Sequence, residues 1–180
     1  MKTLLIIFGV LFLLFLGSQI YLYKSSHDIE GYKYVVIKSY ADFEIRKYEA
    51  SLFTSVKLDT DDYKQASSNG FSILGGYIFG KNEQKEQISM TSPVAMTLED
   101  EMTMMFLVPK AFTKDNLPKP ENSAIQFIEM PEKKMAAISF NGWASNEKIE
   151  KYKVALIKLL DENGIKYSNT FSVLGYNPPY

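Results

Sequence analysis

Hydrophobic and polar residues alternate along several stretches of the chain, and this alternation predicts half-buried β-strands. In the first stretch Phe43 and Ile45 alternate with Glu44 and Arg46. The same spacing recurs further along the chain, in residues 52–58, 104–108, 125–130 and 135–140. The last two stretches flank residues 131–134, Pro-Glu-Lys-Lys, so we expect a turn to join them.

Two other segments place apolar residues three or four positions apart, as one face of an amphipathic helix does. Asp61 or Asp62 can cap the first helix, which we expect to run to about Gly75. The residues of its shared face, several of them small enough to allow close approach to a sheet, are Tyr63, Ala66, Ser67, Gly70, Phe71 and Leu74. Ser145 can cap the second helix, which we expect to end at Asn163-Gly164. Its apolar stripe consists of Ile149, Tyr152, Leu156, Leu159 and Leu160.

The predicted order of elements occurs twice. Residues 43–58 predict strand, turn and strand before the first helix, and residues 125–140 predict the same series before the second. A repeated unit of this kind indicates an α+β domain with internal duplication. We therefore predict a pseudo-two-fold, distorted antiparallel sheet or barrel that carries both helices on one face, with a cleft along the pseudo-axis.

The chain starts with an apolar segment that differs from everything after it. Residues 3–23 contain no charged side chain, while Lys2 and Lys24 flank them. About 20 helical residues span an apolar layer of about 30 Å, so the segment predicts a single-pass transmembrane signal anchor. A cleaved signal peptide is the alternative, although Gly17 and Ser18 provide no clear cleavage pattern. Residues 24–31 then form a linker, and residues 32–180 form a domain that we expect outside the cytoplasm.

Composition narrows the classes of function. A length of 180 residues fits one domain, and a formal charge of −1 argues against general nucleic-acid binding. The absence of cysteine excludes disulfides, iron–sulfur ligation and cysteine nucleophiles. The single histidine, His27, excludes multi-histidine zinc sites and lies in the linker, away from any recognisable catalytic partner. A binding module, a structural protein, or an enzyme that uses carboxylates or tyrosine remains.

Five ordered blocks carry a resemblance to a known family. They are Phe43–Glu49, Gly70–Glu83, Ile88–Val94, Phe140–Trp143 and Gly175–Pro179. Together they resemble the SOUL haem-binding family over almost all of the chain after residue 32. The resemblance implies a distorted antiparallel barrel or sheet with two helices, built from a duplicated unit. It also implies binding of haem or a related tetrapyrrole in an apolar surface groove.

The resemblance also suggests which residues bind the ligand. The family's proposed surface, formed by the first helix and the loop after the last strand, corresponds here to Ser67, Phe71, Leu74 and Tyr176, and we add Met90. Core packing is the alternative role for each of them. The candidates for pairing with the propionates of a porphyrin are Arg46, Lys47 and Lys64. For Arg46, the only arginine, pairing with a cross-strand carboxylate is the favoured alternative.

No side chain stands out as an axial ligand for iron. Some family members have a histidine at the position that corresponds to Lys47. Methionine could replace it as an iron ligand, although methionine is also a common core residue. The methionines that lie close together in the sequence are Met90, Met96, Met102, Met104 and Met105. We therefore expect weak or purely hydrophobic binding of the tetrapyrrole, with no metal site.

The sequence predicts a non-catalytic carrier or buffer of a tetrapyrrole, and two alternatives remain. The duplicated fold resembles the GyrI-like effector-binding domains, some of which hydrolyse small molecules with Glu and Tyr. For such chemistry the chain offers Glu44, Glu49 and Glu129 besides its tyrosines. The other alternative is a protein-interaction module at a membrane surface.

Overall fold

The computed structural model describes residues 12, 15, 29–99 and 101–176. The predicted transmembrane segment, residues 3–23, and most of the linker, 24–31, lie outside these residues. No helix within the described residues is long and apolar enough to cross a membrane. Gly31–Tyr180 is a compact unit of its own.

The fold is α+β, with two helices and antiparallel sheets, which confirms the predicted class. The described elements are β1 (Tyr34–Ser39), β2 (Glu44–Tyr48), β3 (Ser51–Leu58), α2 (Tyr63–Ile78), β4 (Val94–Thr97), β5 (Met102–Leu107), β6 (Gln126–Met130), β7 (Lys133–Ala137), α3 (Asn146–Glu162) and β8 (Ser172–Gly175). Strand, strand and helix follow one another twice, as β2–β3–α2 and as β6–β7–α3, as the alternation indicated.

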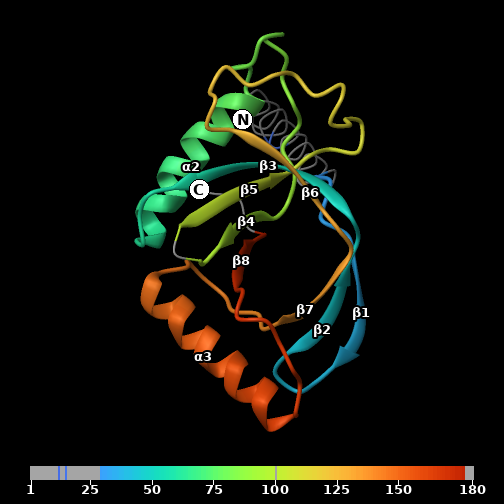
Figure 1. The fold of residues 1–180 in the computed structure, drawn as a ribbon, viewed down its shortest axis with the longest axis vertical. Helices are drawn as coiled ribbons and strands as arrows, with labels where there is room; N and C mark the ends of the chain where they lie inside the picture. The colour runs from blue at the N-terminus through green and yellow to red at the C-terminus, as the bar shows by residue number, and fades with distance from the viewer. Residues whose placement is uncertain (1–11, 13–14, 16–28, 100, 177–180) are drawn as a thin grey trace, which may run out of the picture. The chain divides into compact units, whose positions relative to one another are not determined.

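The strands form two sheets, one with the order β1-β2-β7 and one with the order β6-β3-β5-β4-β8. A single register connects them. β2 and β7 pair from Glu44 opposite Ala137 to Tyr48 opposite Lys133. β3 and β6 continue the same register, with Ser51 opposite Met130. The two residues between β2 and β3 therefore lie level with the two between β6 and β7, as Figure 1 shows on the right side of the domain.

This register corrects the prediction of strand–turn–strand units. Neither β2 and β3 nor β6 and β7 pair with each other; each of these pairs is one long strand that bends from one sheet into the other. The predicted turn at residues 131–134 is a bend of two residues, because β7 already begins at Lys133. The alternation of side chains predicted the strands correctly, but it does not show which of them pair with each other.

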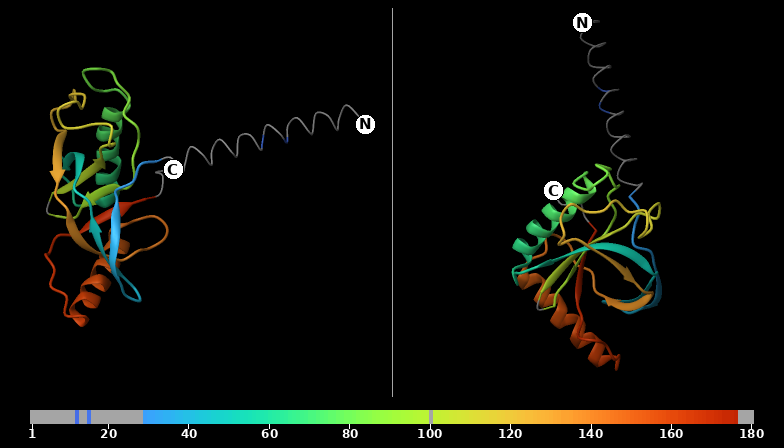
Figure 2. Two further views of the ribbon diagram at one scale, coloured as in Figure 1. Left: turned by 90° about the vertical axis from the view of Figure 1, so that its right-hand side faces the viewer. Right: turned by 45° about the horizontal axis from the view of Figure 1, so that its top comes forward.

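Each helix covers a different sheet, which corrects the prediction that both lie on one face of a single sheet. α2 closes one buried cluster against the five-stranded sheet, whose side chains there include Val56, Leu58 and Met104. α3 closes another against the three-stranded sheet, where Leu156 and Leu160 pack on Phe43 and the neighbouring strand residues. Figure 2 shows the two helices in different parts of the domain.

A further buried cluster lies between the sheets. It joins Tyr48 of β2, Phe53 of β3, Ala95 of β4 and Met105 of β5, with Met135 and Leu174 half-buried beside them. Side chains from both sheets thus meet around the bend of the long strands. This cluster holds the two sheets together.

The ends of both helices follow their sequence signals. Asp62 caps α2 by accepting a hydrogen bond from the Gln65 backbone N–H at 2.6 Å, and Ser145 caps α3 by accepting one from Lys148 at 3.3 Å. The two N-termini also bind each other. The Asn146 side chain donates to Asp62 at 3.2 Å and accepts from the Tyr63 backbone N–H at 2.9 Å.

Gly70 allows α2 to approach the sheet closely. A Cβ atom at this position would lie 2.9 Å from both Cβ and Sδ of Met104 and 3.0 Å from Leu58. Gly75, one turn later, leaves ordinary room, since its nearest neighbour would be Phe71 at 3.5 Å. Gly70 and Gly75 of α2 therefore have different roles.

We expect Gly70→Ala to lower the free energy of unfolding by about 1–3 kcal/mol, because Met104 of β5 must move to admit the methyl group. Gly75→Ala is the matched control and should raise the same free energy by up to about 1 kcal/mol, since alanine favours helix more than glycine does. Urea unfolding followed by circular dichroism measures both. Equal effects of the two substitutions would contradict the close approach at Gly70.

Candidate ligand-binding groove

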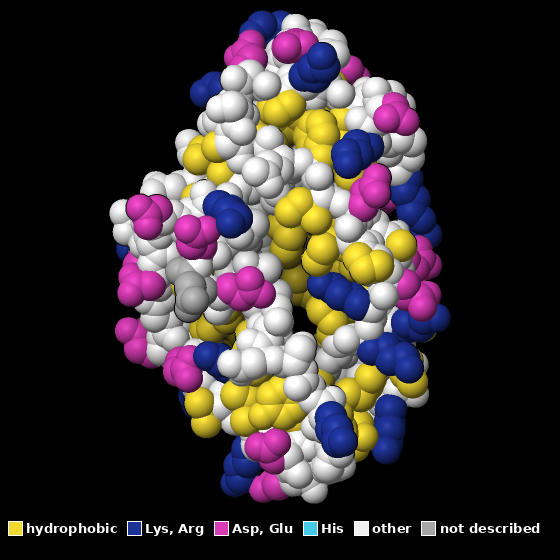
Figure 3. Space-filling view, viewed as in Figure 1, with side chains coloured by type: hydrophobic (Ala, Val, Ile, Leu, Met, Phe, Trp, Pro, Cys, Tyr) yellow, Lys and Arg dark blue, Asp and Glu magenta, His cyan; other side chains and the backbone are white. Residues whose placement is uncertain are grey.

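Two adjoining cavities form one groove in the domain. The first has a volume of about 670 Å³ and the second about 630 Å³. Both are lined by Ser67 and Phe71 of α2 and by Trp143 and Ala144 of the segment before α3. Figure 3 shows a hollow in the middle of the face drawn there, bordered by hydrophobic side chains.

The larger cavity lies where the two sheets separate. β7 is an outer strand of the three-stranded sheet and β8 an outer strand of the five-stranded sheet, and they do not pair with each other. Residues 135–137 of β7 and 172–175 of β8 both line the cavity, and residues 138–144 border it as well. The groove is therefore the gap that remains between two outer strands.

The helix wall and the segment before α3 supply aromatic surface. The half-buried Phe71 ring packs 5.5 Å from the ring of Phe106, between centroids. Trp143 is 74% exposed although it lines both cavities. Its segment is held in place by Lys148, whose ammonium donates to the backbone oxygens of Asn141 at 2.7 Å and Trp143 at 3.3 Å.

Arg46 of β2 is the cation of the larger cavity. Its side chain is only 13% exposed and forms an ion pair with Glu44, with 2.8 Å between Nε and Oε2. Its guanidinium carbon lies 4.6 Å from the centre of the Tyr34 ring. Burial acts to lower the pKa of Arg46, but Tyr48 and Glu44 raise the pKa overall, so the side chain stays charged. The predicted carboxylate partner exists, but on the same strand rather than across it.

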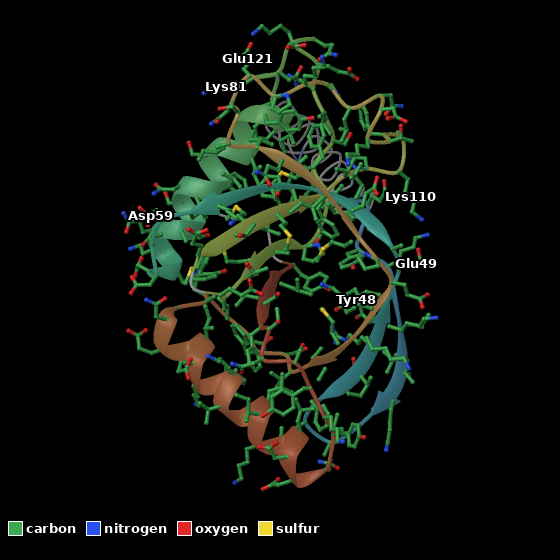
Figure 4. The ribbon with its side chains drawn as sticks, in the orientation of Figure 1. Tyr48, Glu49, Asp59, Lys81, Lys110 and Glu121 are labelled. Atoms are coloured by element: carbon green, nitrogen blue, oxygen red, sulfur yellow. The ribbon has the colours of Figure 1, made fainter. Side chains whose placement is uncertain are left out.

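Tyrosines surround this arginine. The ring centroid of Tyr48 lies 5.0 Å from that of Tyr34 and 4.6 Å from that of Tyr32. The buried hydroxyls of Tyr48 and Tyr32 have no hydrogen-bond partner among the described residues. Burial, reinforced by Tyr48, raises the pKa of Tyr176, which lines the cavity. Figure 4 shows Tyr48 on the inner side of the bend and Glu49 on the outer side.

Comparison with known proteins identifies the family. Residues 29–180 match the family described as SOUL heme-binding protein. The chain belongs to the SOUL family. Mouse (Mus musculus) and human (Homo sapiens) proteins named "Heme-binding protein 2" are both 29% identical to this SOUL chain. The matches cover 77% and 76% of it and 71% of each relative. A Xenopus laevis protein named "Heme-binding protein 1" is 26% identical over 76% of each chain.

Membership in the SOUL family confirms the resemblance, while the roles of single residues stay predictions. Ser67, Phe71, Tyr176 and Arg46 line the larger cavity, and Lys64 lines the smaller one. Elements far apart in the sequence thus bring most of the predicted residues to one groove.

Three predicted residues lie elsewhere. Leu74 is 0% exposed in the cluster under α2, because it faces the sheet rather than the groove. Met90 is half-buried against the same cluster. Lys47 alternates with Arg46 along β2, so its side chain points to the opposite face of the sheet, where it pairs with Glu132 at 2.9 Å.

The side chains considered as iron ligands are dispersed in this SOUL chain. Met96, Met102 and Met104 are buried under α2, and Met105 is buried between the sheets. His27 lies outside the described residues. Met135 lines the larger cavity and was not among the predicted ligand-binding residues. Its strand pattern was visible in the sequence, but which strand it would lie beside was not.

The carboxylates considered for hydrolysis are not buried. Glu44 is half-buried and paired with Arg46, while Glu49 and Glu129 are exposed. Hydrolytic chemistry of the GyrI-like kind was expected to need a buried carboxylate beside a tyrosine. None of these three provides one.

Sequence reasoning did not place Trp143 and its neighbours in the site. Trp143 belongs to a block that carried the family resemblance, yet its segment has neither strand nor helix periodicity. The available signal was chemical. A large aromatic residue directly after Asn141-Gly142 sits on a turn, and exposed aromatic residues on turns often contact ligands.

We expect Tyr48→Phe to leave the free energy of unfolding unchanged or to raise it by up to about 1 kcal/mol, because the lost hydroxyl has no partner among the described residues. Tyr77→Phe is the matched control. The buried Tyr77 hydroxyl donates to the Pro118 backbone oxygen at 2.8 Å, so its loss should cost about 1–2 kcal/mol. Thermal and urea unfolding measure the difference. A Tyr48→Phe protein as unstable as Tyr77→Phe would show that the Tyr48 hydroxyl is hydrogen-bonded after all.

Proposed function

We propose that this SOUL-family chain binds haem or another tetrapyrrole in the groove and acts as a non-catalytic carrier or buffer of that ligand. Family membership and the names of the mouse, human and Xenopus relatives support the ligand class. The proposal includes attachment to a membrane by residues 3–23 in a single pass, with the folded domain outside the cytoplasm. The uncharged character of that segment supports this part.

The observation that carries the proposal is the composition of the groove walls. A tetrapyrrole is a flat apolar disc with carboxylates on one edge, so its site needs apolar faces and a cation near one end. Phe71, Phe140 and Trp143 supply aromatic surface, and Arg46 supplies the cation. A volume of about 670 Å³ lies within the range of ordinary ligand pockets, which is about 300–1,000 Å³.

Burial of the disc, rather than ligation of iron, would supply most of the affinity. Among the described residues of the larger cavity, Met135 and Tyr176 are the side chains whose chemistry suits iron. Neither is the neutral imidazole that most readily binds haem iron. A carrier that relies on apolar contacts should therefore accept a tetrapyrrole with or without its metal.

We expect the full-length protein in neutral detergent to bind haemin and iron-free protoporphyrin IX one-to-one. Both dissociation constants should be micromolar or lower and lie within about tenfold of each other. Soret absorbance and quenching of Trp143, the only tryptophan, measure binding in the same titration. Detergent without protein is the blank. A linear, unsaturable response in both signals would overturn the proposed function.

Phe71→Asp should abolish this binding, because it places a carboxylate on the helix wall of the groove. Phe79→Asp is the matched control: Phe79 is 61% exposed at the end of the same helix and lines neither cavity. Circular dichroism must show both variants folded. Equal loss of binding in the two variants would mean that the groove is not the site.

Membrane attachment has its own test. The full chain should stay in the membrane pellet after carbonate extraction, whereas a chain that begins at Gly31 should not, because it lacks the apolar segment. Protease added to intact and to opened cells reports on which side the domain lies. A full chain released by carbonate would contradict a transmembrane anchor.

A further inference from the structure

One face of the three-stranded sheet carries a set of polar side chains where it meets the larger cavity. Arg46 lines that cavity, whereas Tyr48 and Lys133 line neither cavity. Tyr48 and Arg46 alternate along β2 and therefore point to the same face. Lys133 of β7 lies directly opposite Tyr48, and directly paired residues share a face. Tyr176 lines the larger cavity from beyond β8. Three separate parts of the chain thus converge here.

The charges of this set do not balance. Arg46 is positive and has Glu44 as its partner. Lys133 is positive and half-buried, and burial lowers its pKa, as expected for a cation removed from water. No ion pair between described residues involves Lys133. One positive charge therefore remains on a partly buried face, which attracts an anion.

Arg46 has more hydrogen-bond donors than its neighbours use. Its Nε atom donates to Glu44, and the Tyr48 hydroxyl lies beside the guanidinium, whereas a guanidinium carries five N–H donors. The Tyr48 hydroxyl is buried without a partner among the described residues, although it is near enough to Arg46 and Tyr176 to raise the pKa of both. A raised pKa keeps the Tyr176 phenol protonated, so it can donate. A buried donor without an acceptor is costly, and a ligand acceptor would remove that cost.

We propose that Arg46 and Tyr176, which line the larger cavity, form a binding subsite for one carboxylate, with Tyr48 and Lys133 on the sheet face beside them, so that the ligand enters with an acid group first. This inference rests on the proposed function and adds the orientation of the ligand and a requirement for a free acid. In a tetrapyrrole the recognised group is a propionate. Charge-assisted hydrogen bonds from the guanidinium and the phenol offset the free-energy cost of removing the carboxylate from water.

The test compares protoporphyrin IX with its dimethyl ester, which has the same ring and no free acid. Both are titrated into the full-length protein in the same neutral detergent, and quenching of Trp143 is followed. The wild type should bind the free acid at least tenfold more tightly than the ester. Tyr176→Phe should weaken binding of the acid about tenfold, as expected for a lost hydrogen bond to a charged group, and leave the ester unchanged.

Arg46→Gln should remove the preference for the acid altogether. Lys134→Gln is the matched control, because Lys134 is an exposed cation on the adjacent position of β7, pointing to the opposite face, and lines neither cavity. It should change neither affinity. If Arg46→Gln does not fold, Tyr176→Phe, which keeps the shape of the side chain, still decides the question.

The outcomes separate the two proposals. Equal affinity of the wild type for acid and ester overturns the carboxylate subsite and leaves tetrapyrrole binding intact. Binding of neither compound overturns the proposed function and the subsite with it. A preference for the acid that Lys134→Gln reduces as much as Tyr176→Phe does would show general attraction by surface charge, which also overturns the subsite.

Discussion

The antiparallel pairing of two long, bent strands is the constraint on which the rest of the structure depends. Since β2 pairs with β7 and β3 with β6 in one register, the two sheets cannot move apart at the bend. Away from the bend the sheets diverge, and their outer strands β7 and β8 face a gap that no backbone hydrogen bond closes. The groove thus results from two sheets that are joined at the bend and separate beyond it.

The buried polar groups beside that gap have fewer hydrogen-bond and charge partners than those of an ordinary core. Two tyrosine hydroxyls lack partners among the described residues, and Arg46 and Lys133 bring charge to a partly buried face. Such buried groups reduce the stability of the fold unless a hydrogen-bond partner or an opposite charge compensates for their lost hydration. The cluster under α2, in contrast, is apolar and closely packed around Gly70. The domain therefore combines a well-packed half with a half whose polar groups suit a ligand.

Local features of the fold could be predicted from the sequence, while its long-range pairing could not. Asp62 and Ser145 marked the starts of the helices because capping depends on neighbouring backbone groups. The alternation of strand residues was also visible, but period two is the same for a hairpin and for a strand that changes sheets. Leu74 was placed in the groove because helical spacing alone does not distinguish the side facing the sheet. Trp143 was not predicted to line the groove because its segment has no periodicity, whereas Phe71 lines it as the family resemblance and the helix face both indicated.

The shared register also limits how the length of this chain can vary. Inserting or deleting one residue within β2, β3, β6 or β7 would turn every later side chain of that strand to the other face, exchanging core and surface. Both sheets would lose their match together, because each long strand belongs to both. Changes of length disturb no strand register in the connections, such as residues 79–93, 109–124 and 163–171, which lie outside the paired strands. Size differences among folded variants of this domain should therefore be confined to those connections.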